Sequence, residues 1–146
     1  MSPGQVHLIR QSFAEISRYD HVAALVFYRR LFELDPSLRP LFVTDIEEQA
    51  KKLTDMLGVL ISMLGRPSGL DMELRAMGAR HAAYGVKDEH YGLAASALLG
   101  MLAEVLGPAF TTQVKDAWMA LYIEIEEKMK RGAREDAAVE KWNNPA

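Results

Sequence analysis

The sequence predicts an all-α protein of about six substantial helices, and three observations carry that prediction. Apolar residues recur every three or four positions in almost every segment, which is the spacing of a buried helix face. β-branched residues are sparse, and no segment alternates apolar and polar residues as a half-buried strand does. Capping residues and Gly or Pro stops divide the chain. We expect residues 1–146 to form one domain of packed helices, with about 131–146 as a charged C-terminal extension.

The ends of the first two helices are marked by polar caps and by proline. Ser2 and Gln5 have the spacing of a capping box at the start of the first helix. Asp20 begins the second helix, and Pro36 ends it, because the residue before a proline avoids helical geometry. A short turn then runs to Phe42. The apolar faces of these helices are Val6, Ile9, Phe13 and Ile16, then Ala24, Tyr28, Leu31 and Phe32.

The next two helices are separated by a segment rich in glycine and proline, residues 65–69. The third helix opens with a second capping box at residues 45–48 and runs to Leu64. The fourth runs from about Asp71 to Tyr84, before the glycine stop at 85. Their inward stripes are Ile46, Gln49, Leu53, Met56, Leu60 and Leu64, then Leu70, Leu74, Met77, His81 and Tyr84.

Two long helices complete the chain. Asp88 caps the fifth helix, and Gly107 with Pro108 ends it. Thr111 or Thr112 caps the last helix, whose charged end either continues the helix or frays. The inward stripes are Tyr91, Ala94, Leu98, Leu102 and Val105, then Val114, Trp118, Leu121, Ile125 and Met129.

The composition excludes several classes of function. The net charge is −3, from 17 Lys and Arg against 20 Asp and Glu, so we expect no nucleic-acid partner. The absence of cysteine excludes disulfides, iron–sulfur clusters and thiolate metal sites. The N-terminus has no apolar signal core, and the apolar stretches 53–64 and 93–106 fall short of a bilayer span. We therefore expect a soluble, cytoplasmic protein with no membrane contact.

Two polar residues, Gln49 and His81, interrupt otherwise apolar helix faces. A buried polar group without a partner costs about 1–3 kcal/mol, so each side chain needs a partner, which can be a bound ligand. The pattern also fits a core histidine bonded to a carbonyl and a glutamine that reaches water. Tyr28 likewise fits a packed ring with its hydroxyl at the rim. These residues taken singly name no cofactor.

Taken together, several segments in register resemble the globin family, and within it the neuroglobins and the bacterial single-domain haemoglobins. The resemblance covers residues of about 5 to 130 and rests on Leu8–Phe13, Leu31–Pro36 with Pro40–Phe42, Gly85–Lys87, and Leu106–Thr111 followed by Trp118. It implies a globin fold of six to eight helices around haem b, iron protoporphyrin IX.

The resemblance also implies roles for individual residues. His81 matches the proximal histidine, whose neutral imidazole is a good ligand for ferrous iron. Phe42 matches the phenylalanine that wedges the haem ring. Gln49 and Tyr28 match the two distal polar positions, where both can donate hydrogen bonds and slow the release of oxygen. Leu53 matches the apolar residue beside the gas site.

Further positions are implied around the edge of the haem. Lys52 falls where the family often places a base near a haem propionate, although a solvated helix face explains it equally well. Arg80 can also reach a propionate. Met77 and Val86 fall at positions that flank the proximal side. Tyr91 matches the tyrosine that flavohaemoglobins pair with the proximal histidine and a glutamate.

The sequence departs from its relatives at two places. The helix of Gln49 carries no histidine, so we predict an iron without a second histidine ligand, whereas neuroglobins have one; Tyr28 or water is left as a sixth ligand of the ferric form. Ala133 stands where flavohaemoglobins have their glutamate. Glu135 is a poor substitute, because two residues rotate a helix by roughly 200°.

Three functional interpretations remain open on the sequence alone. The first is reversible binding of oxygen, carbon monoxide or nitric oxide at a pentacoordinate ferrous iron. The second is a nitric oxide dioxygenase that needs a separate reductase, because the chain has no flavin domain and no glycine-rich nucleotide loop. The third is a sensor, either haem-based or haem-free; His81 argues against the haem-free form.

Overall fold

The computed structural model describes residues 1–42 and 45–143, with side chains described up to residue 135. Within these residues the protein consists of six α-helices and two short 3-10 helices, with no strand, so the predicted all-α class is confirmed. The elements are α1 (Pro3–Ser17), α2 (Asp20–Leu34), η1 (Pro36–Leu41), α3 (Ile46–Ser62), α4 (Pro67–Ala83), α5 (His90–Leu106), η2 (Gly107–Ala109) and α6 (Thr112–Asn143).

Most of the predicted helix ends are confirmed by their hydrogen bonds. Ser2 and Gln5 form the reciprocal capping box, with both bonds 3.1 Å long. The Asp45 carboxylate accepts from the N–H of Glu48 at the start of α3. Thr111 caps α6, since its hydroxyl accepts a backbone N–H at 3.2 Å. These contacts are local in sequence, which is why the sequence could predict them.

Three local predictions are wrong. Helix α4 begins at Pro67 and not near Asp71, because a proline at the first helical position lacks only an N–H that would have no helical partner there. Asp88 does not cap α5, whose N-cap position makes no side-chain bond; the ring Nδ1 of His90 accepts the N–H of Lys87 instead. Tyr84 is 67% exposed, because α4 ends before it.

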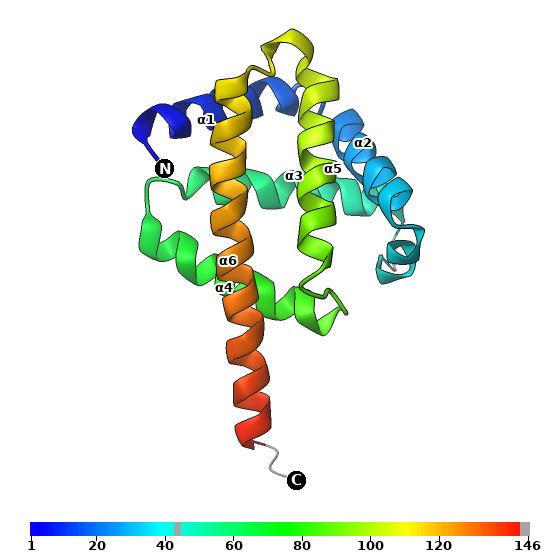
Figure 1. The fold of residues 1–146 in the computed structure, drawn as a ribbon, viewed down its shortest axis with the longest axis vertical. Coiled ribbons are helices and arrows are strands. Elements are labelled where there is room, and N and C mark those ends of the chain that lie inside the picture. Colours follow the sequence, from blue (N-terminus) through cyan, green and yellow to red (C-terminus); the bar gives the residue numbers. More distant parts are fainter. Residues whose placement is uncertain (43–44, 144–146) are drawn as a thin grey trace.

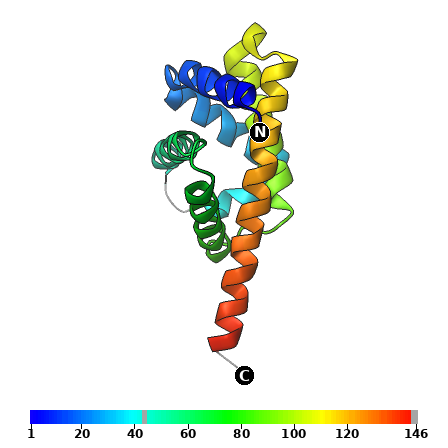
Figure 2. The same ribbon diagram turned by 90° about the vertical axis from the view of Figure 1, so that its left-hand side faces the viewer.

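Helices α5 and α6 run antiparallel and form one layer, and α1 to α4 lie on the other side of it (Figures 1 and 2). Helix α2 packs mainly on α5, whereas α1 and α4 pack on α6. The segment 90–109 is long and apolar enough to cross a membrane, whereas we expected every apolar stretch to be too short. Helix α5 nevertheless packs against α1, α2 and α6 within the helical assembly.

The centre of the core contains one polar contact between distant residues. The Trp118 indole N–H donates to the Ser12 hydroxyl at 2.8 Å, and both side chains are buried. Ser12 in turn donates to the Leu8 carbonyl at 2.7 Å, one turn back along α1. This chain of bonds fixes α1 against α6 and satisfies the one polar atom of the largest core side chain.

We expect Ser12→Ala to lower the free energy of unfolding by about 1–3 kcal/mol, since it leaves the buried Trp118 N–H without its partner. Chemical denaturation should register the loss, together with a fall in melting temperature of roughly 3–10 °C. Ser17→Ala is the matched control: Ser17 makes the same kind of bond, to the Phe13 carbonyl, but is exposed. It should change stability by less than about 0.5 kcal/mol.

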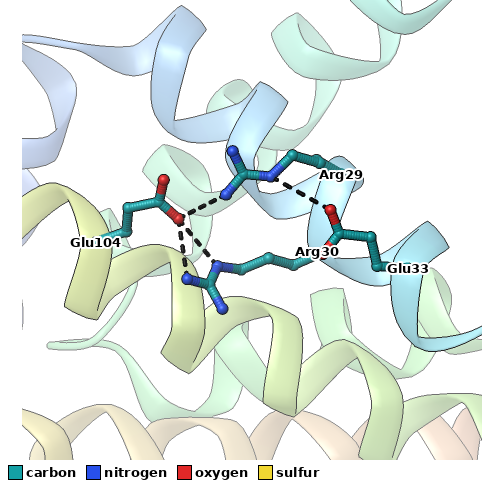
Figure 3. Close-up of polar contacts among 4 residues, drawn as sticks. All are labelled: Arg29, Arg30, Glu33 and Glu104. Carbon is teal, nitrogen blue, oxygen red and sulfur yellow. Dashed lines mark hydrogen bonds and ion pairs between the residues drawn. The ribbon is translucent and has the colours of Figure 1, made fainter.

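Helices α2 and α5 are joined at their surface by a shared carboxylate (Figure 3). One oxygen of Glu104 accepts from Arg29 at 2.7 Å and from Arg30 at 2.9 and 3.1 Å. Arg30 lies across α5 where Gly100 leaves room, because a Cβ at that glycine would meet the guanidinium chain at 2.7–2.8 Å. All three charged side chains are more than a third exposed, so the cluster orients α5 more than it stabilises the fold.

Helices α4 and α6 touch through their backbones. A Cβ at Gly78 of α4 would overlap the carbonyl group of Met129, and a Cβ at Gly132 of α6 would overlap that of Arg75. Ion pairs flank this crossing, and Asp71 takes part in two of them, with Arg75 at 3.1 Å and Lys128 at 3.2 Å. The position of α4 is therefore fixed closely by α6.

Candidate functional site

His81 lies in the last turn of α4, one turn beyond the glycine crossing. Its Nδ1 is 2.8 Å from the Met77 carbonyl oxygen. A carbonyl can only accept, so Nδ1 carries the hydrogen and Nε2 keeps its lone pair. Burial lowers the pKa of His81, and the neighbouring Arg80 cation adds to the effect, while the bond to Met77 opposes it. The ring is thus neutral and oriented, which is the form in which histidine binds a metal.

Tyr28 of α2 contacts the backbone of Gln49 on α3, and the distal roles expected for the two side chains stay a prediction. The Tyr28 hydroxyl donates to the backbone carbonyl of Gln49 at 3.3 Å, which is long for an O–H···O bond. Tyr28 is only 5% exposed, and burial raises the pKa of its hydroxyl to about 12. The hydroxyl therefore remains a hydrogen-bond donor at neutral pH.

Phe42 follows η1 and joins an aromatic cluster around Tyr28. Its ring centroid is 5.3 Å from that of Tyr28 and 5.5 Å from that of Phe32, both in edge-to-face geometry. Phe42 is only partly buried although it packs on the core. The Tyr28 ring is thus packed among aromatic side chains.

Helices α3 and α4 follow one another in the chain, yet in the described residues they do not pack against each other along their length. Apolar side chains on and beside them, among them Leu53 and Val86, are left only partly buried, and so is His81. A haem fits this donor set, because a porphyrin provides four ring nitrogens and needs from the protein one neutral imidazole and apolar walls. The residues present are therefore suited to haem.

The remaining predicted residues lie around this region with different exposure. Met77 is buried, and its carbonyl orients His81. The Val86 N–H donates to the His81 carbonyl at 3.0 Å, which ties the segment after α4 back to the helix. Lys52 is exposed on α3, and Arg80 is exposed and 3.3 Å from Glu73. The roles of Lys52 and Arg80 at the propionates stay predictions.

The contacts of Tyr91 with α6 were not predicted from the sequence. Its carbonyl accepts from the Tyr122 hydroxyl at 2.6 Å, and the Lys130 ammonium stands 5.5 Å from the centroid of its ring. Lys130 is also paired with Glu126 at 2.8 Å. Burial is the main cause that raises the pKa of Tyr91. Spacing along α6 gives no signal for these contacts, because they join residues of two helices.

Glu135, which we expect to be a poor substitute for the flavohaemoglobin glutamate, is paired with a residue of α4. It lies 3.3 Å from Arg75 on α4. Lys130, and not a glutamate, therefore stands over the Tyr91 ring in the described part of α6.

A neutral, half-buried histidine on α4, and a tyrosine of α2 that meets α3 at Gln49, in a fold of packed helices, fit a haem protein of the globin type. The globin family model matches residues 25–129, and the chain belongs to the globin family. Globins bind haem and diatomic gases, and this is the class of activity that the family assigns.

Several relatives resemble the chain over most of its length. Neuroglobin of Danio rerio is 31% identical over 139 residues, which cover 86% of this chain and 87% of the neuroglobin. Neuroglobin of Tetraodon nigroviridis is 28% identical over 146 residues. A flavohemoprotein of Xylella fastidiosa is 27% identical over 124 residues; these cover 83% of this chain but 31% of the flavohemoprotein.

Solved structures agree with the family. A carbene transferase engineered from RmaNOD of Rhodothermus marinus, a protein described as a nitric oxide dioxygenase, superposes with a TM-score of 0.84 at 29% identity, over 95% of this chain and 97% of that one. Myoglobin of Aplysia limacina superposes with a TM-score of 0.80 at 18% identity, over 90% of this chain and 97% of the myoglobin, which supports the fold alone.

Proposed function

We propose that this globin binds oxygen reversibly at a pentacoordinate ferrous haem b. The observation that carries the proposal is the meeting of Tyr28 and Gln49 on α2 and α3, with the neutral His81 on α4. When bound, the haem supplies an iron atom with an open coordination position for a diatomic gas. No cysteine is available for covalent attachment, which favours haem b over a c-type haem. The lack of cysteine also suits a reducing cytoplasm.

Each residue has a defined part in the proposal. His81 holds the haem through Nε2, while its bond to the Met77 carbonyl keeps the ring oriented. Phe42 and Leu53 would supply apolar walls that keep water away from the haem. With haem bound, the Tyr28 hydroxyl would be able to leave its long bond to the Gln49 carbonyl and to donate a hydrogen bond to a diatomic ligand. Helix α3 contains no histidine, so no second imidazole competes for the distal side.

Tyr28→Phe tests the proposal, and we expect the oxygen dissociation rate to rise about tenfold, since one hydrogen bond of about 1–1.5 kcal/mol is lost. Stopped-flow displacement of oxygen by carbon monoxide measures this rate. Tyr84→Phe is the matched control, because Tyr84 is 67% exposed on the segment after α4, and its rate should equal that of the wild type. An unchanged rate in Tyr28→Phe would show that the hydroxyl does not donate to the ligand.

A nitric oxide dioxygenase served by a separate reductase is the second candidate. It is favoured by the likeness to RmaNOD and to the flavohemoprotein, of which this chain covers only the globin-sized part. Against it, Ala133 stands where flavohaemoglobins have their glutamate, which argues for weak electron donation to the proximal ligand. Steady turnover of nitric oxide with a supplied flavin reductase would favour the enzyme, and a single turnover would favour the binding protein.

A further inference from the structure

The Tyr28 hydroxyl is held in place more by aromatic packing around its ring than by its own hydrogen bond. The bond to the Gln49 carbonyl is 3.3 Å long, which is weak for a hydroxyl donor. The Tyr28 ring, in contrast, has three aromatic neighbours, with Phe27 and Phe42 edge-to-face at 5.1 and 5.3 Å and Phe32 stacked at 6.0 Å. The direction of the hydroxyl is therefore set mainly by these rings.

Arg39, an exposed residue of η1, contacts two of these three neighbours. Its guanidinium carbon lies 5.5 Å from the centroid of the Phe32 ring, which is the range of a cation–π contact. Its Nη1 donates to the Phe42 carbonyl at 3.0 Å, and the Phe42 N–H donates to the Arg39 carbonyl at 3.1 Å. Two hydrogen bonds in opposite directions thus join Arg39 to Phe42 at the end of η1.

The beginning of η1 is anchored independently of Arg39. The Asp35 carboxylate accepts from the N–H of Ser37 at 3.0 Å and from its hydroxyl at 2.6 Å, and Leu38 is buried in the core. Arg39 forms no ion pair with a carboxylate in the part of the chain that the structure describes. Its replacement should therefore leave the fold intact and act on Phe32 and Phe42.

The chemistry of a guanidinium suits this double contact. The group is flat and carries its N–H donors in a fixed fork, so it can lie against a ring and donate to a carbonyl at the same time. The rings of Phe32 and Phe42 are 5.5 Å apart and edge-to-face. Because one group holds both residues, it restrains the angle between the two rings that pack against Tyr28.

We propose that Arg39 is a positioning residue of the oxygen site, which holds Phe32 and Phe42 at the angle that directs the Tyr28 hydroxyl to the bound gas. The inference rests on the proposed function, because it takes this hydroxyl to be a donor to the ligand. A functional side chain is held in one orientation by the packing of its neighbours. Loss of Arg39 leaves the hydroxyl present but allows its ring more orientations, so the hydrogen bond to the ligand is weakened.

The infrared C–O stretching frequency of the haem-loaded carbon monoxide complex tests the proposal, because a hydrogen-bond donor beside the bound gas lowers this frequency. Arg39→Met removes both contacts and should raise the frequency, though less than Tyr28→Phe does. The oxygen dissociation rate should rise by about two- to fivefold, because the hydrogen bond is weakened and not lost. Arg18→Met is the matched control, since Arg18 is exposed at the end of α1, and it should leave both values unchanged.

Arg39→Lys distinguishes the shape of the side chain from its charge. An ammonium keeps the positive charge but lacks the flat fork that reaches the Phe42 carbonyl from the face of Phe32. The lysine variant should therefore resemble Arg39→Met in both frequency and rate. Wild-type values in Arg39→Lys would assign the effect to charge and would overturn the proposal.

The double variant of Arg39→Met and Tyr28→Phe separates this inference from the proposed function. If Arg39 acts through Tyr28, Arg39→Met should change neither the frequency nor the rate once Tyr28 is phenylalanine. An undiminished effect in that background would overturn the inference and leave the proposed function standing. The same holds if Arg39→Met alone has no effect while Tyr28→Phe has its own.

The remaining outcomes are also decisive. If Tyr28→Phe itself shifts neither value, the hydroxyl does not donate to the gas, and the inference falls with that part of the proposed function. Faster loss of haem from Arg39→Met with an unchanged C–O frequency would assign Arg39 to anchoring the haem and overturn its positioning role. Circular dichroism melting of each variant establishes that the chain is folded.

Discussion

Replacing His81 with alanine should remove the ability of the chain to retain haem. The neutral imidazole is the residue that we assign to the iron, and its orientation is fixed by the bond to the Met77 carbonyl. Loss of the hydrogen-bond partner of a metal ligand already lowers metal affinity by about 10–100-fold. Loss of the ligand itself should therefore lower haem affinity by more than about 100-fold. The Soret absorbance that stays with the protein after gel filtration of a haem-reconstituted sample measures the loss.

The control and the rescue separate ligation from a structural role. His21→Ala removes an exposed histidine of α2 and should leave haem binding unchanged. Imidazole added to His81→Gly should restore the spectrum, because a free ligand can take the place of the missing side chain. If His81→Ala held haem as tightly as the wild type, another residue would be the ligand and the assignment would be wrong.

Gly132→Ala should produce a large loss of stability. The added methyl group would overlap the Arg75 carbonyl of α4, and neither backbone can move without moving its helix. Overpacking of this kind costs about 1–3 kcal/mol and occasionally more, which corresponds to a fall in melting temperature of roughly 3–10 °C. Because His81 lies on the same helix as Arg75, we also expect the iron–histidine stretching frequency of the ferrous protein to shift.

Gly58→Ala is the matched control for this prediction. Gly58 lies inside α3, and a Cβ there would meet only the Phe13 ring, at 4.0 Å, which is an ordinary contact. Alanine should therefore stabilise the protein by about 0.5–1 kcal/mol through its better helix propensity. A Gly132→Ala variant as stable as Gly58→Ala would contradict the backbone contact between α4 and α6.

The helices could be predicted from the sequence because their signals are local. The 3.6-residue period and the caps at Ser2 and Asp45 depend on residues within one or two turns, and the structure confirms them. The errors at Pro67 and Asp88 are local too. Proline and aspartate can each occupy more than one position near the start of a helix. The residue type alone therefore does not give the first helical residue, which depends on the contacts of its neighbours.

The candidate site was only partly predictable. His81 and Gln49 stood out because they interrupt apolar stripes, but the stripes could not name what they bind. Resemblance to the globins supplied the haem, and family membership supports it. The structure then shows Tyr28 in contact with Gln49, and His81 neutral and oriented by Met77.

By itself the sequence determined the helical class and most helix ends. The tertiary structure alone decided that Trp118 bonds to Ser12, that Glu135 turns to Arg75, and that Lys130 stands over Tyr91. It also decided that Gly78 and Gly132 are contact points, although glycine in a helix usually only weakens it. The physical reason is distance along the chain. Periodicity and capping follow from neighbouring residues, whereas these contacts join helices whose relative positions depend on the packing of the whole core.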